Sequence, residues 1–274
     1  MTAGLATGGA GPSALRGLLG SAHLGPTLAV TVLVALLSGA QGLYAAQAAL
    51  VVAAVLAGQL SIGWSNDLVD VARDRSTGRD DKPLATGDGS VRAVRVACAV
   101  ALASTVVLSL AVGVVAGLVH LGCVACGWAY NLGLKSTAWS WLPYALAFGG
   151  LTVFVSLADG SMPPWWWPVG AGLLGVGAHL VNVLPDVEDD LATGVRGLPH
   201  RLGPRRIAPV AAAVLALASV VVLVGASPPP AAASAVGLVV IALVALVVVG
   251  RGRVPFVAAI AIALVDTVLL VVVR

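Results

Sequence analysis

Asn66–Gly87 reads N-D-L-V-D-V-A-R-D-R-S-T-G-R-D-D-K-P-L-A-T-G and follows a long apolar run. The whole chain has only 12 acidic residues. Six of them lie in this segment or directly after it: Asp67, Asp70, Asp74, Asp80, Asp81 and Asp88. Four more lie together between Asp186 and Asp190. Two acidic clusters in an otherwise apolar chain are the feature that any functional interpretation must explain.

The composition is that of a membrane protein. Of its 274 residues, 59% are hydrophobic and 10% are charged, whereas a soluble domain carries roughly a quarter charged residues. The net charge of +3 is spread over short loops, so it indicates no nucleic-acid partner, and nothing in the sequence indicates an obligate protein partner. We predict a disordered, Gly-rich tail over residues 1–15 and a single transmembrane domain over residues 16–274.

Nine apolar segments are long enough to be membrane-spanning helices, which need about 20 residues to cross a bilayer. The predicted spans are Ala22–Leu37, Tyr44–Trp64, Val91–Ala111, Val114–Tyr130, Trp139–Leu157, Trp165–Leu184, Ile207–Val224, Ala231–Val249 and Val254–Val273. The third and fourth are nearly continuous, and we divide them near Gly113 because together they are too long for one span. The predicted fold class is therefore all-α.

The basic residues predict the orientation, because cytoplasmic loops are enriched in Lys and Arg. With the N-terminus inside, nine spans place 14 of the 15 basic residues on the cytoplasmic side, and only Arg274 lies outside. The connections predicted on the other side contain no Lys or Arg. We therefore expect a multi-pass protein of the cell (plasma) membrane, with both acidic clusters in the cytoplasm and the C-terminus outside.

The two acidic clusters are copies of one motif. Both fit N-x-L-x-D-V-x-x-D-x-x-T-G, and eight residues of an 18-residue window are identical at a constant offset of 116. The identical pairs are Asn66 and Asn182, Leu68 and Leu184, Asp70 and Asp186, Val71 and Val187, Asp74 and Asp190, Thr77 and Thr193, Gly78 and Gly194, and Pro83 and Pro199. Since each copy ends a predicted span, we expect two half-sites that face one another across a shared cavity.

Helical spacing predicts what each half-site can bind. Asp67, Asp70 and Asp74 share one helix face, and so do Asp186 and Asp190, although Pro185 is expected to kink the second copy. Carboxylate and amide oxygens are hard ligands suited to Mg²⁺, which takes one or two carboxylates together with phosphate oxygens. The predicted metal ligands are Asn66, Asp67, Asp70, Asp74, Asp186 and Asp190.

Basic residues beside both clusters predict that the bound group is a diphosphate. The predicted substrate-binding residues are Asn66, Arg73, Arg79, Lys82, Lys135, Asn182 and Arg196. Arg offers a bidentate fork to phosphate and Lys a point charge. A water-poor cavity below such a site suits a long apolar tail, so the expected substrate is an isoprenyl diphosphate. Metal and cations would stabilise the leaving diphosphate while a nucleophile captures the allylic carbocation.

These motifs resemble those of the UbiA superfamily of intramembrane prenyltransferases. The first motif, N-D-x-x-D-x-x-x-D, is met at Asn66–Asp74, and K-P-L-A-T-G follows at Lys82–Gly87. The second, D-x-x-x-D, is met at Asp186 and Asp190, and a Tyr-Lys element between them resembles Tyr130 and Lys135. The resemblance implies a helical bundle around a central cavity open to lipid, two Mg²⁺ ions that bridge the diphosphate, and catalytic roles for Tyr130 and Lys135.

Three functions fit the sequence. The favoured one is transfer of a prenyl group to a lipophilic acceptor, most simply an aromatic compound or quinone precursor. The second is a membrane terpene cyclase, in which the carbocation is captured within the same molecule and aromatic side chains stabilise it. The third is a transporter, since intramembrane acids and internal repeats occur there too. Against it, both copies lie on one side of the membrane.

Four polar residues lie in or beside the predicted spans. Asp266 is expected to be protonated and hydrogen-bonded inside the ninth span. For His120 and His179 we favour packing or hydrogen bonding over a functional role. His23 could face the cavity or lie at the membrane interface, and we favour the interface.

Overall fold

The computed structural model describes residues 12–192 and 194–272, and all regular structure in this part of the chain is helical. Helix α1 (Pro12–Gly20) begins inside the predicted disordered tail, so that prediction is wrong for residues 12–15. The rest of the tail lies outside the described residues, as do Thr193 of the second motif copy and Arg274.

Each of the nine predicted spans coincides with an apolar helix in the described ranges. These helices are α2 (Leu24–Gln41), α3 (Ala45–Ser76), α5 (Val91–Val112), α6 (Val114–Leu132), α7 (Leu142–Ala158), α8 (Trp166–Val183), α11 (Pro204–Ala226), α12 (Pro230–Val249) and α13 (Val254–Val272). Eight are long and apolar enough to cross a membrane, and α7, with 17 residues, is slightly shorter. Gly113 separates α5 from α6 as predicted, with φ 156° and ψ 148°.

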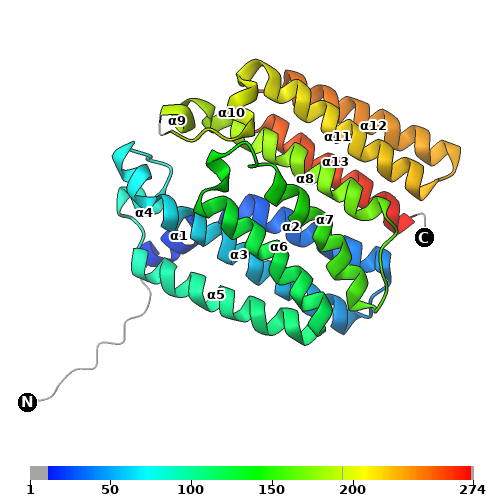
Figure 1. Cartoon of the computed structure of the whole chain (residues 1–274), viewed down its shortest axis with the longest axis horizontal. Helices are drawn as coiled ribbons and strands as arrows, with labels where there is room; N and C mark the ends of the chain where they lie inside the picture. The colour runs from blue at the N-terminus through cyan, green and yellow to red at the C-terminus, as the bar shows by residue number, and fades with distance from the viewer. Residues whose placement is uncertain (1–11, 193, 273–274) are drawn as a thin grey trace, which may run out of the picture.

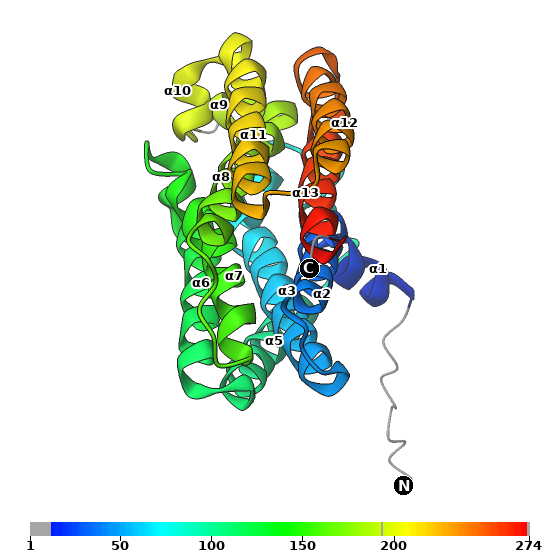
Figure 2. The same ribbon diagram turned by 90° about the vertical axis from the view of Figure 1, so that its right-hand side faces the viewer.

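The helices form one bundle with α5 along one edge and α11 and α12 along the other (Figure 1). Helix α3 packs against α2, α5 and α6, while α8 packs against α7 and α11. The last helix, α13, lies beside α12 and also beside α2 (Figure 2). The first and last spans are therefore neighbours, which closes the bundle around its interior.

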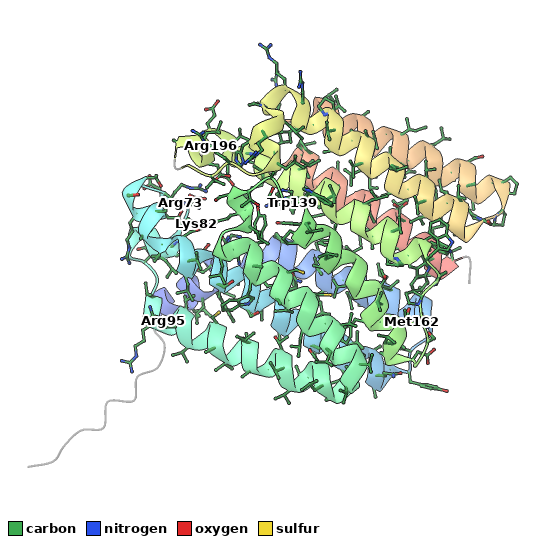
Figure 3. The ribbon with its side chains drawn as sticks, viewed as in Figure 1. Arg73, Lys82, Arg95, Trp139, Met162 and Arg196 are labelled. Atoms are coloured by element: carbon green, nitrogen blue, oxygen red, sulfur yellow. The ribbon has the colours of Figure 1, made fainter. Side chains whose placement is uncertain are left out.

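Short helices gather at one end of the bundle. They are α4 (Pro83–Thr86), η1 (Leu134–Ser136), η2 (Leu184–Asp186), α9 (Val187–Ala192) and α10 (Leu198–Leu202). Figure 3 shows Arg73, Lys82 and Arg196 near this end, with Met162 at the opposite end. The loops that carry the acidic motifs and most of the basic residues thus share one end, as the charge pattern predicts.

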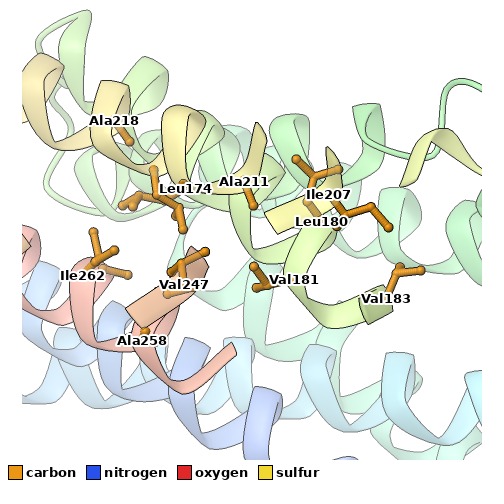
Figure 4. Packing of buried hydrophobic residues seen from close by; sticks show 14 of the residues in the cluster. Leu174, Leu180, Val181, Val183, Ile207, Ala211, Ala218, Val247, Ala258 and Ile262 are labelled. Atoms are coloured by element: carbon orange, nitrogen blue, oxygen red, sulfur yellow. The ribbon is translucent and has the colours of Figure 1, made fainter. Parts of the chain in front are cut away.

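Close packing of α8 fixes the helix that leads into the second motif. Leu180 of α8 belongs to a buried cluster with Ile207 of α11 and Ile262 of α13 (Figure 4). A Cβ added at Gly177 would lie 2.5 Å from the side chain of Leu215, so a larger residue there would force Leu215 or the two helices to shift. Small residues commonly serve this purpose between membrane helices, where van der Waals packing drives association.

Candidate active site

A cavity of about 330 Å³ runs into the bundle between α2, α3, α6, α7, α8 and α13. The polar residues that line it at the motif end are Asn66, Asp70, Arg73, Asp74, Arg79, Lys82, Asn131, Lys135, Asn182, Asp186 and Asp190. Apolar side chains such as Leu33, Leu151 and Leu174 line the remainder. The structure therefore places both copies of the motif on one cavity with a charged end and an apolar interior.

The first half-site lies on the last turns of α3, which continues well past the end of the predicted span. Both oxygens of Asp70 accept hydrogen bonds from Lys135 Nζ, at 2.6 and 2.5 Å. Asp70 Oδ2 also accepts one from Arg73 Nη2 at 2.9 Å. The Arg73 guanidinium reaches Asp74 as well, with Nε 3.7 Å from Oδ1. Both carboxylates are buried, so these cations replace much of the solvation that water would provide.

Asp67 lies behind the cavity wall rather than on it. Its Oδ1 accepts hydrogen bonds from Lys82 Nζ at 2.7 Å and from His23 Nε2 at 2.8 Å. Its Oδ2 is buried and has no hydrogen-bond partner among the described residues. Lys82 and His23 both line the cavity, so Asp67 contacts the site through them.

His23 corrects the sequence prediction, which favoured the membrane interface. It lines the cavity and contacts Asp67 because the turn before α2 lies directly on α3. Gly63 of α3 permits this approach, since a Cβ there would lie 2.6 Å from the carbonyl oxygen of Ala22. No local pattern in the sequence could have indicated this contact between distant segments.

The second half-site begins where α8 gives way to η2 at Leu184–Asp186, followed by α9. A turn of 3₁₀ helix lies at Pro185, where the sequence predicts a kink. Asp190 Oδ2 forms a hydrogen bond with His200 Nε2 at 3.2 Å, and the His200 side chain is only 2% exposed. His200 was missed from the sequence. The repeat gave no signal for it, because the corresponding residue of the first copy is Leu84.

Arg79 links the two half-sites. It forms a bidentate pair with Asp81, at 2.8 and 2.9 Å. Its Nη2 lies 3.3 Å from Asp186 Oδ1, and its Nη1 lies 4.0 Å from Asp189 Oδ2. The Arg79 guanidinium lowers the pKa of Asp81 to about 2. An arginine from the first motif loop therefore neutralises carboxylates of the second.

Lys135 is held by contacts between two loops. Gly197 follows the second motif and lies so close to the Lys135 carbonyl oxygen that a Cβ there would collide with it. The Leu198 N–H donates to Ser140 Oγ at 2.9 Å. Ser140 Oγ in turn forms a hydrogen bond with His179 Nε2 at 3.1 Å. The loop that carries Lys135 is thus docked on the loop of the second half-site, and His179 takes part by hydrogen bonding.

Aromatic rings line the cavity below the charged end. Tyr130 contacts Tyr144 edge to face, with centroids 5.2 Å apart. Tyr144 also stacks against Phe148, at 6.3 Å. All three line the cavity, as does His120, which forms a hydrogen bond with Ser109 Oγ at 2.7 Å. Tyr130 therefore shares the cavity with the charged side chains and with a cluster of aromatic rings.

Two other predicted residues lie away from this cavity. Arg196 is exposed on the loop before α10 and does not line the cavity. Asp266 is buried in α13 and accepts a hydrogen bond from Ser219 Oγ at 2.8 Å, which confirms that it is hydrogen-bonded. It lines a separate cavity of about 70 Å³ that shares Leu151 and Leu174 with the main one.

Comparison with known sequences decides the family. The model of the UbiA prenyltransferase family matches residues 27–265, which is most of the chain. The chain belongs to the UbiA prenyltransferase family. The family predicted from the motifs is thereby confirmed, and so is the all-helical fold class predicted from the apolar segments.

Among sequence relatives, the bacteriochlorophyll synthase 33 kDa chain of Cereibacter sphaeroides is 35% identical over 186 residues. The match covers 62% of this chain and 60% of the relative, so the chain spans about three fifths of that relative's length.

Two solved structures of UbiA homologs share the fold. The apo structure from Aeropyrum pernix K1 has a TM-score of 0.75 at 19% identity, covering 91% of this chain and 98% of that one. The homolog from Archaeoglobus fulgidus bound to GPP and Mg²⁺ has a TM-score of 0.70 at 18% identity, covering 93% and 98%.

The site of this UbiA family member fits Mg²⁺ in its donor set but is not arranged around an ion. Four carboxylates, Asp70, Asp74, Asp186 and Asp190, line one end of the cavity with the amides of Asn66 and Asn182. Such oxygen donors are those that Mg²⁺ takes. Within the described ranges, however, no three His, Cys, Asp or Glu side chains are grouped closely enough to hold a metal ion. The carboxylates are instead paired with Lys, Arg and His side chains.

Gly197→Ala is expected to displace Lys135 and lower turnover by roughly tenfold, because a 1 Å misplacement of a positioning residue can cost more than that. The added Cβ would collide with the backbone at Lys135 and lie 2.8 Å from Ser140 Oγ. Initial rates of prenyl transfer would measure the effect. Gly122→Ala is the matched control, since a Cβ there meets nothing within 4 Å. Equal rates in both variants would contradict the positioning role of this contact.

Proposed function

We propose that the protein catalyses Mg²⁺-dependent transfer of a prenyl group from an isoprenyl diphosphate to a lipophilic acceptor within the membrane. One observation carries the proposal: the carboxylates of both motif copies and four Lys or Arg side chains meet at one end of a cavity that is otherwise apolar. A diphosphate matches the charged end and an isoprenyl chain matches the interior. Membership in a prenyltransferase family supports the same reaction class.

The proposed metal ligands are Asn66 and the four motif carboxylates that line the cavity; Asp67, a ligand in the sequence prediction, is placed behind them. When bound, Mg²⁺ would neutralise charge on the diphosphate as the allylic C–O bond breaks. Asp70, Asp74, Asp186 and Asp190 line the cavity directly and are placed to hold the metal, and Asp67 supports them from behind through Lys82. An Archaeoglobus fulgidus homolog has been solved with GPP and Mg²⁺, which supports this assignment.

The basic residues would hold the diphosphate itself. Arg73, Arg79, Lys82 and Lys135 all line the charged end. Arg79 can present two parallel N–H groups to a phosphate, and Lys135 a compact charge. Fixed cations of this kind stabilise charge that develops on a leaving group without reorganising during the reaction. We also propose Arg196 as a diphosphate contact from the loop before α10, although it does not line the cavity.

The apolar walls and aromatic rings would guide the carbocation. Tyr130, Tyr144 and Phe148 lie along the cavity where the allylic carbons would be placed, and their faces can stabilise a cation by about 0.5–2 kcal/mol. The surrounding apolar side chains exclude water, which would otherwise quench the cation. Tyr130 and Lys135 are the proposed catalytic residues, because both line the cavity that would hold the breaking bond.

We propose that the protein lies in the plasma membrane and that the charged end of the cavity is on the cytoplasmic side. Lys and Arg accumulate on the cytoplasmic side of multi-pass proteins, and the motif loops with their basic residues share one end of the bundle (Figure 3). Both substrates would then be taken up at the inner face, the diphosphate from the aqueous side and the acceptor from the lipid.

The test is a reaction with purified protein in nanodiscs. Geranyl, farnesyl and geranylgeranyl diphosphates are each supplied with Mg²⁺ and a panel of aromatic acceptors, including a bacteriochlorophyll precursor because of the similarity to the Cereibacter sphaeroides chain. We expect diphosphate release that depends on the acceptor and on Mg²⁺, a prenylated product, and loss of both on chelation. A cyclic hydrocarbon formed without acceptor, or uptake into liposomes without diphosphate chemistry, would contradict the proposal.

A further inference from the structure

We propose that, before diphosphate binds, Lys and Arg side chains of the protein are paired with the carboxylates that would bind the metal. Diphosphate must take over these side chains as its own partners before Mg²⁺ can bind the carboxylates tightly. This inference rests on the proposed function and specifies how the site is loaded. It makes Lys135, Arg73 and Arg79 exchangeable partners, first of the carboxylates and then of the diphosphate.

The evidence is that every motif carboxylate contacts an internal base. The contacts are Lys82 and His23 on Asp67, Lys135 and Arg73 on Asp70, Arg73 on Asp74, Arg79 on Asp186, and His200 on Asp190. These bases come from five separate segments of the chain. Their convergence places a positively charged or hydrogen-bonding side chain on each carboxylate that the sequence predicts as a metal ligand.

Lys135 is the most restrictive of these bases. Its ammonium is hydrogen-bonded to both oxygens of Asp70, and the two side chains are only 11% and 9% exposed. A carboxylate whose oxygens are engaged in this way offers little to a metal ion. For Mg²⁺ to bind Asp70 in the absence of substrate, the Lys135 ammonium must give up its ion pair with Asp70. Leaving a buried ammonium group without a counter-ion costs free energy, because little water is available to solvate it.

A bound diphosphate removes that cost. Lys135, Arg73 and Arg79 line the cavity beside the carboxylates that they contact, so their long side chains can turn to a phosphate without a change of fold. Each base then gains phosphate oxygens in place of carboxylate oxygens. The released carboxylates become free to bind metal, so the metal and the diphosphate each favour the binding of the other.

Reciprocity gives this exchange a measurable form. If diphosphate tightens metal binding by some factor, then metal must tighten diphosphate binding by the same factor. Direct bridging of metal and phosphate would also couple the two ligands. The exchange adds a distinct requirement: removing Lys135 should strengthen metal binding when no diphosphate is present.

The experiment is a titration of the full-length protein in nanodiscs with Mn²⁺, followed by electron paramagnetic resonance, with and without inorganic diphosphate. We expect wild type to bind Mn²⁺ weakly alone, and Lys135→Met to bind Mn²⁺ alone roughly tenfold more tightly. In Lys135→Met the tightening by diphosphate should shrink correspondingly. Lys135→Arg keeps a cation on Asp70 and should remain close to wild type.

Two further variants make the test specific. Arg201→Gln removes one charge from an exposed position on α10 and should leave Mn²⁺ affinity unchanged. Arg79→Gln frees Asp186, whose side chain is 44% exposed at the end of η2, so a gain in Mn²⁺ affinity is expected there even if Lys135→Met fails to fold.

Equal Mn²⁺ affinity in wild type, Lys135→Met and Arg79→Gln would overturn the exchange, and so would an equal gain in Arg201→Gln. These outcomes differ from failure of the proposed function. That failure would appear as absence of Mg²⁺-dependent diphosphate release by wild type with isoprenyl diphosphate and acceptor.

Discussion

Asp70→Asn is expected to lower the rate of Mg²⁺-dependent diphosphate release by roughly 10²–10³-fold, the loss typical when one preorganised charge-stabilising group is removed. Asp70 lies at the centre of the first half-site, where it contacts both Lys135 and Arg73. Asparagine has nearly the same shape and keeps one acceptor oxygen for Lys135. It lacks the negative charge that holds a metal ion, so the effect should fall on chemistry more than on folding.

The measurement is the initial rate of diphosphate release from an isoprenyl diphosphate at saturating Mg²⁺, with thermal unfolding in detergent as a check of the fold. Asp88→Asn is the matched control, since Asp88 is exposed directly after the same segment and its side chain accepts a hydrogen bond from Thr86. The control should keep nearly full activity. Turnover by Asp70→Asn at the rate of the control would show that the first motif does not hold the reacting group.

Asp186→Asn is expected to lower the same rate by roughly 10²–10³-fold, although it lies on the other copy of the motif. The two half-sites face one cavity and are joined by Arg79, so a single diphosphate would contact both. Residues that act as one unit are strongly non-additive. We therefore expect Asp70→Asn with Asp186→Asn to be little slower than the slower single variant.

A double-mutant cycle measures this coupling directly. Rates of the two single variants and the double variant are compared under the same conditions, with Glu188→Gln as a control on the same helix as Asp190. Multiplication of the two single losses in the double variant would mean that the half-sites act independently. That result would contradict the proposal that one diphosphate is held between both motif copies.

The sequence by itself determined the framework of the protein. The apolar segments predict the helices because crossing a bilayer depends on local length and hydropathy, and this holds for α3, α8 and α13. Gly113 and Pro185 predict breaks because their backbone restrictions are also local. The internal repeat indicates which carboxylates belong together, since it depends only on residue identity and spacing.

Only the tertiary structure decided how the charges pair. Lys135 lies 65 positions from Asp70 in the chain, and His23 lies 44 positions from Asp67. His200 is placed beside Asp190 by α10, and Lys135 is placed by the close approach of Gly197. Such contacts depend on how helices and loops pack rather than on any local pattern. The same acidic clusters that the sequence presents as a metal site are, for this reason, already paired with the protein's own cations.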